Sequence, residues 1–319
     1  MPRSIGLGVV LLTCALPLFC LAQTTNRDVI TRASALVRAG EVDQAEALLR
    51  SALPADPHSA TLHGALGELL LKEHKYEDST IELRQAAQED PESPEYNLME
   101  AAAVIGGKRY VMAVDFLRAV QPRFGDHPQF HYYLGLAYYY QGDMNTAVTQ
   151  LEEAVRLSPE LERAQFLLAN CLLVSGQTAR ALNIFRSLVE DHPDNAFYWA
   201  TLGAKVGHVD AGGSPEESLN AVRHALALDP NDSYVQFVAA TVFTETGNYG
   251  SARPLLEQLE KVTPERLDAH ALLVQVYARL GERELAQKET RIVDQLQKEA
   301  AAQHSATPPV DPGSGPQQP

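Results

Sequence analysis

Cysteine is scarce in this chain. It has 3 cysteines in 319 residues, and Cys14 and Cys20 both fall in the apolar N-terminal segment. If that segment is removed, Cys171 alone remains, which excludes a disulfide framework. We expect Cys171 to be a small buried hydrophobe beside Ala169 and Leu172 rather than a reactive or pairing thiol.

Catalytic motifs are also missing. The sequence has no H-E-x-x-H, no Walker loop and no G-x-S-x-G. His127 and His131 have a spacing that suits a metal on one helix face. However, Pro128 favours the first helical turn and places His127 outside the helix, and no cysteine or carboxylate completes a ligand set. We therefore predict that the chain is not an enzyme and holds no cofactor and no metal ion.

Positive charge is in short supply. Lysine and arginine number 26 against 41 aspartates and glutamates, which gives a formal net charge of −15. Nucleic-acid phosphates would be repelled rather than neutralised, so we expect no nucleic-acid partner. An anionic membrane surface is disfavoured for the same reason. The acidic surface either steers basic partners at low salt or simply keeps the protein in solution.

Apolar runs of membrane-spanning length are missing except at the N-terminus. There, Arg3 precedes an apolar run from Ile5 to Leu16, and small residues lead up to Ala22. This pattern predicts a signal peptide over residues 1–22, cut after Ala22. The alternative is an uncleaved anchor, because the segment nearly reaches the ~18–20 residues that span a bilayer. We expect export to the periplasm or the extracellular space, with no membrane insertion after leader cleavage.

Prolines recur in the sequence at a fixed interval. Pro57, Pro91, Pro159 and Pro193 lie 34, 68 and 34 residues apart, and Pro264 follows Pro230 by 34. A period in the range of about 20–50 residues indicates a solenoid of stacked supersecondary units. With the proline placed at position 32, the units begin at Asn26, Ala60, Pro94, Pro128, Glu162, Ala196, Ser233 and Leu267. The sixth unit carries about three extra residues in the predicted loop between its two helices, residues 207–213, so the second half of this unit is counted back from Pro230.

Small residues and glycines keep the same period. Position 8 of the units holds Ala33, Gly67, Ala101, Gly135, Ala169, Gly203, Ala240 and Val274. Position 20 holds Ala45, Ser79, Ala113, Ala147, Ala181, Ser218, Ala252 and Ala286. Glycine recurs at position 15, where it suits the left-handed end of a helix. Each unit is therefore predicted to be a helix, a tight turn, a second helix and a proline stop, with the two helices in close contact at the small residues.

The repeating pattern resembles the tetratricopeptide repeat. The fourth unit carries it most fully, in Leu134-Gly135, Tyr138-Tyr139, Gly142-Asp143, Ala147, Ala154 and Pro159. The resemblance covers roughly Asn26 to Gln297. Arg32 and Glu100 depart from it, since they stand where the family carries a core leucine, and Gly125 replaces one proline. The resemblance implies an all-α fold, an α-α superhelix built as a right-handed solenoid of antiparallel helix pairs with about eight repeats.

Three regions follow from this pattern. Residues 1–22 are the predicted signal peptide, and residues 23–298 are the predicted repeat array. The array ends in a helix over Glu284–Glu299 that mixes many charges with a narrow apolar stripe, which is typical of a capping helix. Residues 299–319 are rich in proline, glycine, serine and glutamine and are expected to be disordered.

The resemblance also implies a binding face. In tetratricopeptide arrays the first helix of each unit lines the concave face through positions 2, 5, 9, 12 and 13. In units three to five, the predicted groove residues are Leu98, Tyr132, Leu136, Tyr139, Tyr140, Phe166, Asn170 and Leu173. An exposed apolar and aromatic patch of this kind marks a partner site. The alternative is that these side chains are structural filler, buried where neighbouring first helices stack.

The function predicted from the sequence is a non-enzymatic protein–protein interaction scaffold that binds a protein or peptide segment in its concave groove. The alternative keeps the fold and makes the chain a structural subunit of an envelope or secretion assembly, using its convex and end faces. The carboxylate-clamp pattern of the family is not met, because Thr201 stands where asparagine would be needed after Asn170. The sequence specifies neither the partner nor the oligomeric state.

Overall fold

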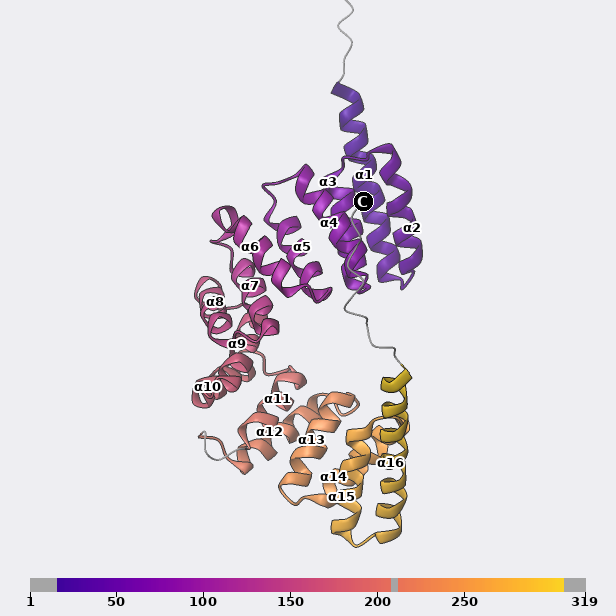
Figure 1. Cartoon of the computed structure of the whole chain (residues 1–319), viewed down its shortest axis with the longest axis vertical. Coiled ribbons are helices and arrows are strands. Elements are labelled where there is room, and N and C mark those ends of the chain that lie inside the picture. The colour runs from indigo at the N-terminus through magenta and orange to yellow at the C-terminus, as the bar shows by residue number, and fades with distance from the viewer. Residues whose placement is uncertain (1–15, 208–211, 307–319) are drawn as a thin grey trace, which may run out of the picture. The chain divides into compact units, whose positions relative to one another are not determined.

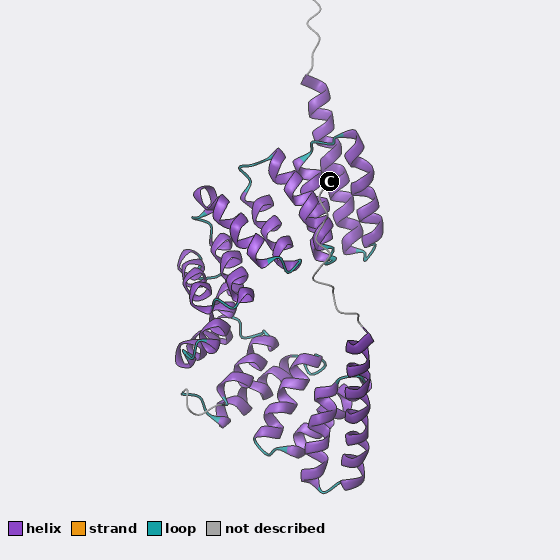
Figure 2. Ribbon diagram, in the orientation of Figure 1, coloured by secondary structure: helices purple, strands orange, loops and turns teal. Residues whose placement is uncertain are grey.

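The fold is built from helices alone over the residues that the structure describes. A computed structural model describes residues 16–207 and 212–306, and in these ranges it contains α-helices, one short 3-10 helix, turns and no strand (Figures 1 and 2). The all-α class predicted from the sequence is therefore confirmed. Residues 1–15, most of the predicted signal peptide, lie outside the described residues.

Consecutive helices form antiparallel pairs joined by short turns (Figure 1). In the first half of the chain the helices are α1 (Leu16–Arg38), α2 (Val42–Ala52), α3 (Ala60–Lys72), α4 (Tyr76–Glu89), α5 (Pro94–Gly106), α6 (Tyr110–Phe124), α7 (Pro128–Gln141) and α8 (Met144–Leu157). The second half contains α9 (Glu162–Val174), α10 (Thr178–Asp191), α11 (Ala196–Val206), α12 (Pro215–Leu228), α13 (Ser233–Glu245), α14 (Tyr249–Val262), α15 (Leu267–Leu280) and α16 (Arg283–Ala306). The 3-10 helix Leu53–Ala55 follows α2.

The first helix of each pair begins where the proline phase predicts. This holds for α3, α5, α7, α9, α11, α13 and α15. The exception is α1, which begins at Leu16, ahead of the predicted start at Asn26, and runs without a break across the predicted cleavage point after Ala22. At the other end, α16 continues past the predicted array boundary at Lys298 to Ala306.

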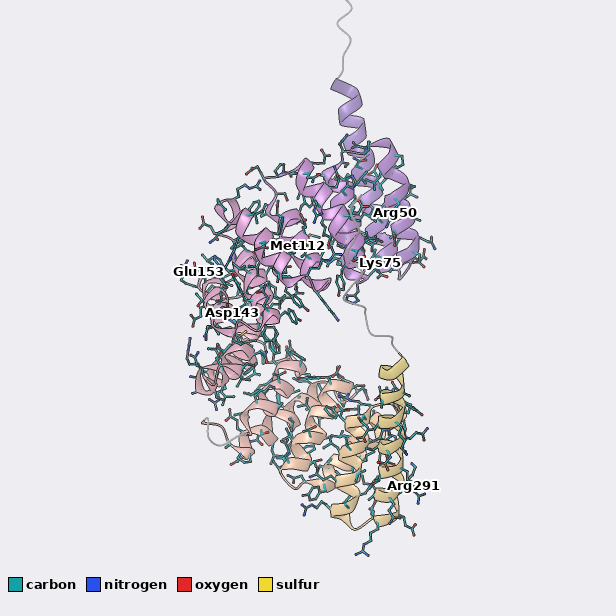
Figure 3. The ribbon with its side chains drawn as sticks, viewed as in Figure 1. Arg50, Lys75, Met112, Asp143, Glu153 and Arg291 are labelled. Atoms are coloured by element: carbon teal, nitrogen blue, oxygen red, sulfur yellow. The ribbon has the colours of Figure 1, made fainter. Side chains whose placement is uncertain are left out.

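Local chemistry explains these helix starts. The side chains of Ser59 and Ser93 cap α3 and α5 by accepting hydrogen bonds from backbone N–H groups three residues on. Asp143, labelled in Figure 3, caps α8 through the backbone N–H of Thr146. Such caps satisfy N–H groups that lack a partner inside the helix. Pro128 opens α7, where its missing N–H costs nothing.

The turns inside the pairs have left-handed backbone. Glycine provides it at Gly40, Gly142, Gly176, Gly247 and Gly281, with φ between +75° and +85°. Repeats two and three have His74 and Lys108 in the same place, each with a φ of 59°. The turn geometry is therefore common to these repeats even where the residue type is not, at a strain that glycine avoids.

Small residues let the two helices of a pair approach closely, as the sequence predicts. A Cβ added to Gly135 would lie 2.7 Å from Cγ of Leu151, and one added to Gly67 would lie 2.5 Å from Cγ of Leu83. Opposite them, Ala147 is fully buried and Ser79 donates from its hydroxyl to the carbonyl oxygen of Gly67 at 2.8 Å. Close-packed interiors leave no space for larger side chains at these points.

A second repeating contact ties each first helix to the loop before it. In repeats two to eight, the side chain of the fourth residue donates a hydrogen bond to the carbonyl oxygen six residues earlier. The pairs are His63 with Pro57, Asn97 with Pro91, His131 with Gly125, Gln165 with Pro159, Trp199 with Pro193, Gln236 with Pro230 and His270 with Pro264. These bonds satisfy a carbonyl that has left the preceding helix.

The chain divides into two compact units, residues 1–171 and 172–319, with the boundary inside α9. Each unit has its own apolar core. The first includes a cluster around Leu62, Leu66 and Leu70, and the second includes one around Leu256 and Leu273. Among the described helices, none is both long and apolar enough to span a bilayer.

Candidate functional site

The tyrosines of α7 form the centre of the predicted binding face. Tyr132 and Tyr139 are partly buried, whereas 51% of Tyr140 is exposed. The ring of Tyr140 stacks on Tyr110 of α6, with 4.9 Å between centroids and 14° between planes, and it meets Tyr139 edge-on at 5.3 Å. Burial raises the pKa of the Tyr132 and Tyr133 hydroxyls, so both stay neutral phenols at physiological pH. This aromatic cluster offers ring surface together with hydroxyl donors.

The other predicted groove residues vary in accessibility. Leu98 is only 6% exposed, so it is a core residue that offers little surface to a partner. Leu136 and Phe166 are partly buried, and Leu173 is partly buried in the last turn of α9, beyond the boundary between the units. Nδ2 of Asn170 donates to the carbonyl oxygen of Phe166 at 2.8 Å, so part of its amide is already used within α9.

Tyr138 lies next to this cluster but belongs to the core. It is 6% exposed, and its hydroxyl oxygen accepts a hydrogen bond from Nη2 of Arg118 at 2.6 Å. The Arg118 guanidinium also lies 5.8 Å from the centre of the Tyr138 ring. Tyr138 and Tyr139 are adjacent in sequence and nevertheless have different environments, because neighbouring helical positions face different directions.

A groove lies between α1 and α3 in the first unit. Its volume is about 420 Å³, and its lining residues are Ile30, Ala33, Ser34, Val37, Arg38, Leu49, Ala65, Glu68, Leu69 and Lys72. Several of these hold the same repeat positions, 5, 9, 12 and 13, as the predicted groove residues. This groove was not predicted from the sequence, because the predicted groove residues were drawn only from repeats three to five. The floor is apolar, and Lys72 pairs with Glu68 at 2.7 Å on the rim.

An aromatic pair lies on the first helices of the second unit. Phe197 of α11 and Tyr234 of α13 are 41% and 39% exposed, and their ring centroids are 5.0 Å apart. The hydroxyl of Tyr234 lies 3.1 Å from that of Thr201, which holds the ring in place. Both aromatic residues occupy position 2 of their repeats. Neither residue was among the predicted groove residues, although position 2 is one of the positions that line the concave face in the family.

One cluster has the composition of a metal site. Ligand atoms of Glu260, His270 and Glu289 lie within 4.8 Å of one another. Both ring nitrogens of His270 are already engaged, Nδ1 with Glu289 at 2.6 Å and Nε2 with the carbonyl oxygen of Pro264 at 2.8 Å. Nζ of Lys288 lies 3.4 Å from Glu260 and 3.5 Å from Glu289. These contacts make the cluster a charge and hydrogen-bond network in which lysine is the cation, so the residues fit a metal ion poorly.

The histidine and cysteine singled out from the sequence have structural contacts. Nδ1 of His131 lies 2.9 Å from Gln150 and its Nε2 lies 2.8 Å from the carbonyl oxygen of Gly125, so neither ring nitrogen is available to a ligand. Cys171 is fully buried, and burial raises the pKa of its thiol to about 11. A thiol that stays protonated is a poor nucleophile.

Family models match most of the described chain. One model of the tetratricopeptide repeat matches residues 36–103 and 138–206, and a second model with the same description matches residues 112–160 and 237–300. Among characterised proteins, the chain is 26% identical over 146 residues to "Cellulose synthase 2 operon protein C" of Komagataeibacter xylinus. That match covers 46% of this chain and 11% of the relative, so the chain spans only a small part of the relative's length.

Solved structures share the fold at low sequence identity. A tetratricopeptide repeat protein from Parabacteroides merdae aligns with a TM-score of 0.59 and 14% identity, covering 79% of this chain and 99% of that one. The Cut9–Hcn1 hetero-tetramer of APC/C aligns with a TM-score of 0.61 and 17% identity, covering 76% of this chain and 48% of that one. At these identities the likeness shows the fold alone.

Proposed function

The chain belongs to the tetratricopeptide repeat family, and we propose that it is a non-enzymatic scaffold whose first helices bind a protein or peptide segment. The repeats support a protein-interaction role in general. We propose in addition that the partner binds the face formed by the first helices and that the chain catalyses no reaction. The proposal draws on the shape of the repeats, in which each first helix presents positions 5, 9, 12 and 13 together.

The observation that carries the proposal is the accessibility of aromatic side chains on first helices. Tyr140 in the first unit, and Phe197 and Tyr234 in the second, keep between 39% and 51% of their surface exposed. Exposed aromatic residues are costly to hydrate and are enriched at binding hot spots. The groove between α1 and α3 adds an apolar floor with a charged rim, which suits a peptide that has both kinds of side chain.

A structural subunit of an envelope or secretion assembly is the second candidate. Three aliphatic residues on second helices are strongly exposed, Ile81 of α4 at 63%, Val111 of α6 at 69% and Val262 of α14 at 63%. Side chains of this kind favour contacts made through the opposite side of the helix pairs. This candidate needs no occupant on the first helices.

We also propose that the chain is exported with cleavage after Ala22. The support is the charge and apolar pattern of the leader. Mass spectrometry of the native protein tests this directly, and we expect a mature chain that begins at Gln23. An intact N-terminus, or a lipid on Cys20, would contradict the proposal.

Hydrogen–deuterium exchange on a complex with a partner purified from the exported fraction separates the two functions. Peptide binding on the first helices predicts protection concentrated in α1, α3, α7, α11 and α13. Protection confined to α4, α6 and α14 would contradict the proposal and favour the structural subunit. Exchange of the free chain provides the reference.

A further inference from the structure

Glu100 places a carboxylate in a core position. It is the seventh residue of its repeat, and it is only 3% exposed. Five other repeats bury a leucine at that position, namely Leu66, Leu134, Leu168, Leu202 and Leu273. Removing an ionised carboxylate from water costs several kcal/mol unless partners compensate for it. A leucine would therefore suit the packing of the third repeat better than the residue that is present.

The contacts that Glu100 makes within the chain offset only part of the cost of burying its carboxylate. Oε1 of Glu100 accepts a hydrogen bond from Nε of Arg84 at 2.8 Å, but the Arg84 side chain is 50% exposed and shares its charge with water. Among the described residues, Oε2 of Glu100 has no hydrogen-bond partner. Burial raises the pKa of the Glu100 carboxyl even though Arg84 acts in the opposite direction. The carboxylate therefore has spare capacity for a cation.

Glu100 lines a cavity of about 410 Å³ that lies between α4, α5 and α6 and is open to solvent. Val104, Phe116 and Val120 contribute apolar lining, and Met112, labelled in Figure 3, is 37% exposed on α6. Asp115 adds a second carboxylate that forms no ion pair with any described residue. The two arginines that border the cavity already have partners. Arg84 donates a hydrogen bond to Glu100, and Arg123 donates one to the carbonyl oxygen of Pro91 at 3.0 Å.

We propose that this cavity binds an alkyl guanidinium or alkyl ammonium group, with the cation at Glu100 and the hydrocarbon stem against Val104 and Phe116. The two oxygens of a carboxylate can accept from Arg84 and from a bound cation together. Long cationic side chains commonly place their stems on apolar surface. The net charge of −15 raises the local concentration of cations around the chain.

The cavity is separate from the first-helix binding face. Asn97, Glu100 and Val104 follow the i, i+3, i+7 spacing and form one stripe of α5, whereas Leu98 of the predicted groove lies on another. Binding at the cavity and binding at the first-helix face can therefore be tested independently. The same ligand chemistry occurs in an arginine or lysine side chain of a partner protein and in a free small amine.

Calorimetric titration of the full chain with butylguanidinium and butylammonium tests the cavity. A charge-assisted hydrogen bond contributes about 1.5–3 kcal/mol, so Glu100→Gln and Glu100→Leu should each weaken binding by about tenfold or more. Glu95→Gln, which changes an exposed carboxylate on the same helix, should leave the affinity unchanged. Tyr139→Ala should also leave it unchanged, which separates this result from the proposed first-helix function.

A capped glycine–arginine–glycine peptide distinguishes the two sources of the cation. Binding that is tighter than that of butylguanidinium indicates a partner side chain, and equal or weaker binding indicates a free amine. The proposal is overturned if the Glu100 variants bind butylguanidinium as well as the wild type does. It is also overturned if butyrate binds in place of the cations, or if neither cation binds.

Discussion

Nδ1 of His270 lies 2.6 Å from Oε2 of Glu289, and both side chains are almost completely buried between α15 and α16. Nε2 of the same ring faces the carbonyl oxygen of Pro264, which can only accept a hydrogen bond. His63 makes the matching contact with Glu82 at 2.7 Å, and His131 makes it with Gln150 at 2.9 Å. In each case the ring joins a loop, a first helix and a second helix.

Replacing Glu289 with alanine should destabilise the C-terminal helix pair. The change leaves the buried His270 ring without its partner at Nδ1, and breaking a buried pair costs ~3–5 kcal/mol. Urea unfolding followed by circular dichroism measures the loss. Glu284→Ala alters an exposed carboxylate on the same helix and should change stability by less than ~0.5 kcal/mol. Equal effects of the two variants would contradict this role of Glu289.

Replacing Ala181 with leucine should overpack the buried position that Ala181 occupies in α10. Ala181 is fully buried at the small position of the fifth repeat, and added volume in a packed core costs ~1–3 kcal/mol. Ala179→Leu on the same helix is the matched control, because Ala179 is exposed. Thermal melting of both variants measures the effect, and an unchanged melting curve for Ala181→Leu would contradict the assigned repeat register.

Cys171 should resist alkylation while the chain is folded. Burial raises the pKa of its thiol to about 11, so the reactive thiolate is a minor form at pH 8. Iodoacetamide labelling followed by peptide mass spectrometry should therefore modify Cys171 in urea and leave it unmodified in buffer. Similar labelling rates in the two conditions would show that the thiol is accessible.

Stability should depend on pH through Glu100. Burial raises the pKa of this carboxyl in the folded state above its pKa in the unfolded state. The protonated carboxyl therefore stabilises the fold at pH values below the unfolded-state pKa, and this stabilisation is lost as the pH rises through the folded-state pKa. The wild type should lose stability relative to Glu100→Gln as pH increases from about 4 to 7. Urea unfolding at both pH values measures the difference, and a constant gap between the two proteins would contradict the prediction.

The sequence predicted the helix pairs because their determinants are local and periodic. Proline stops, turn glycines and small residues at positions 8 and 20 fix where helices begin, turn and touch. Even the third repeat begins at Pro94 as predicted, although its own proline is replaced by Gly125. The start of α1 at Leu16 could not be predicted from the period, because the residues before Asn26 lie outside the repeats.

The candidate site was less predictable because exposure depends on how neighbouring helices pack. Leu98 and Tyr139 hold groove positions in their repeats, yet Leu98 is buried and Tyr139 is only partly so. The stacking of Tyr140 on Tyr110 joins two helices and has no signature in either one. Likewise, the bond from Arg84 to Glu100 was not readable from the departure of Glu100 from the family pattern alone.

We propose that partners bind the first-helix face, and the variant Tyr139→Ala tests this proposal. The free energy of binding to a purified partner should weaken by about 1–3 kcal/mol. The melting temperature should fall less than in Tyr138→Ala, because Tyr139 is only partly buried. Tyr138→Ala is the control, because loss of this core ring should lower stability by ~3–5 kcal/mol. Full retention of affinity by Tyr139→Ala would show that partners do not bind through this face.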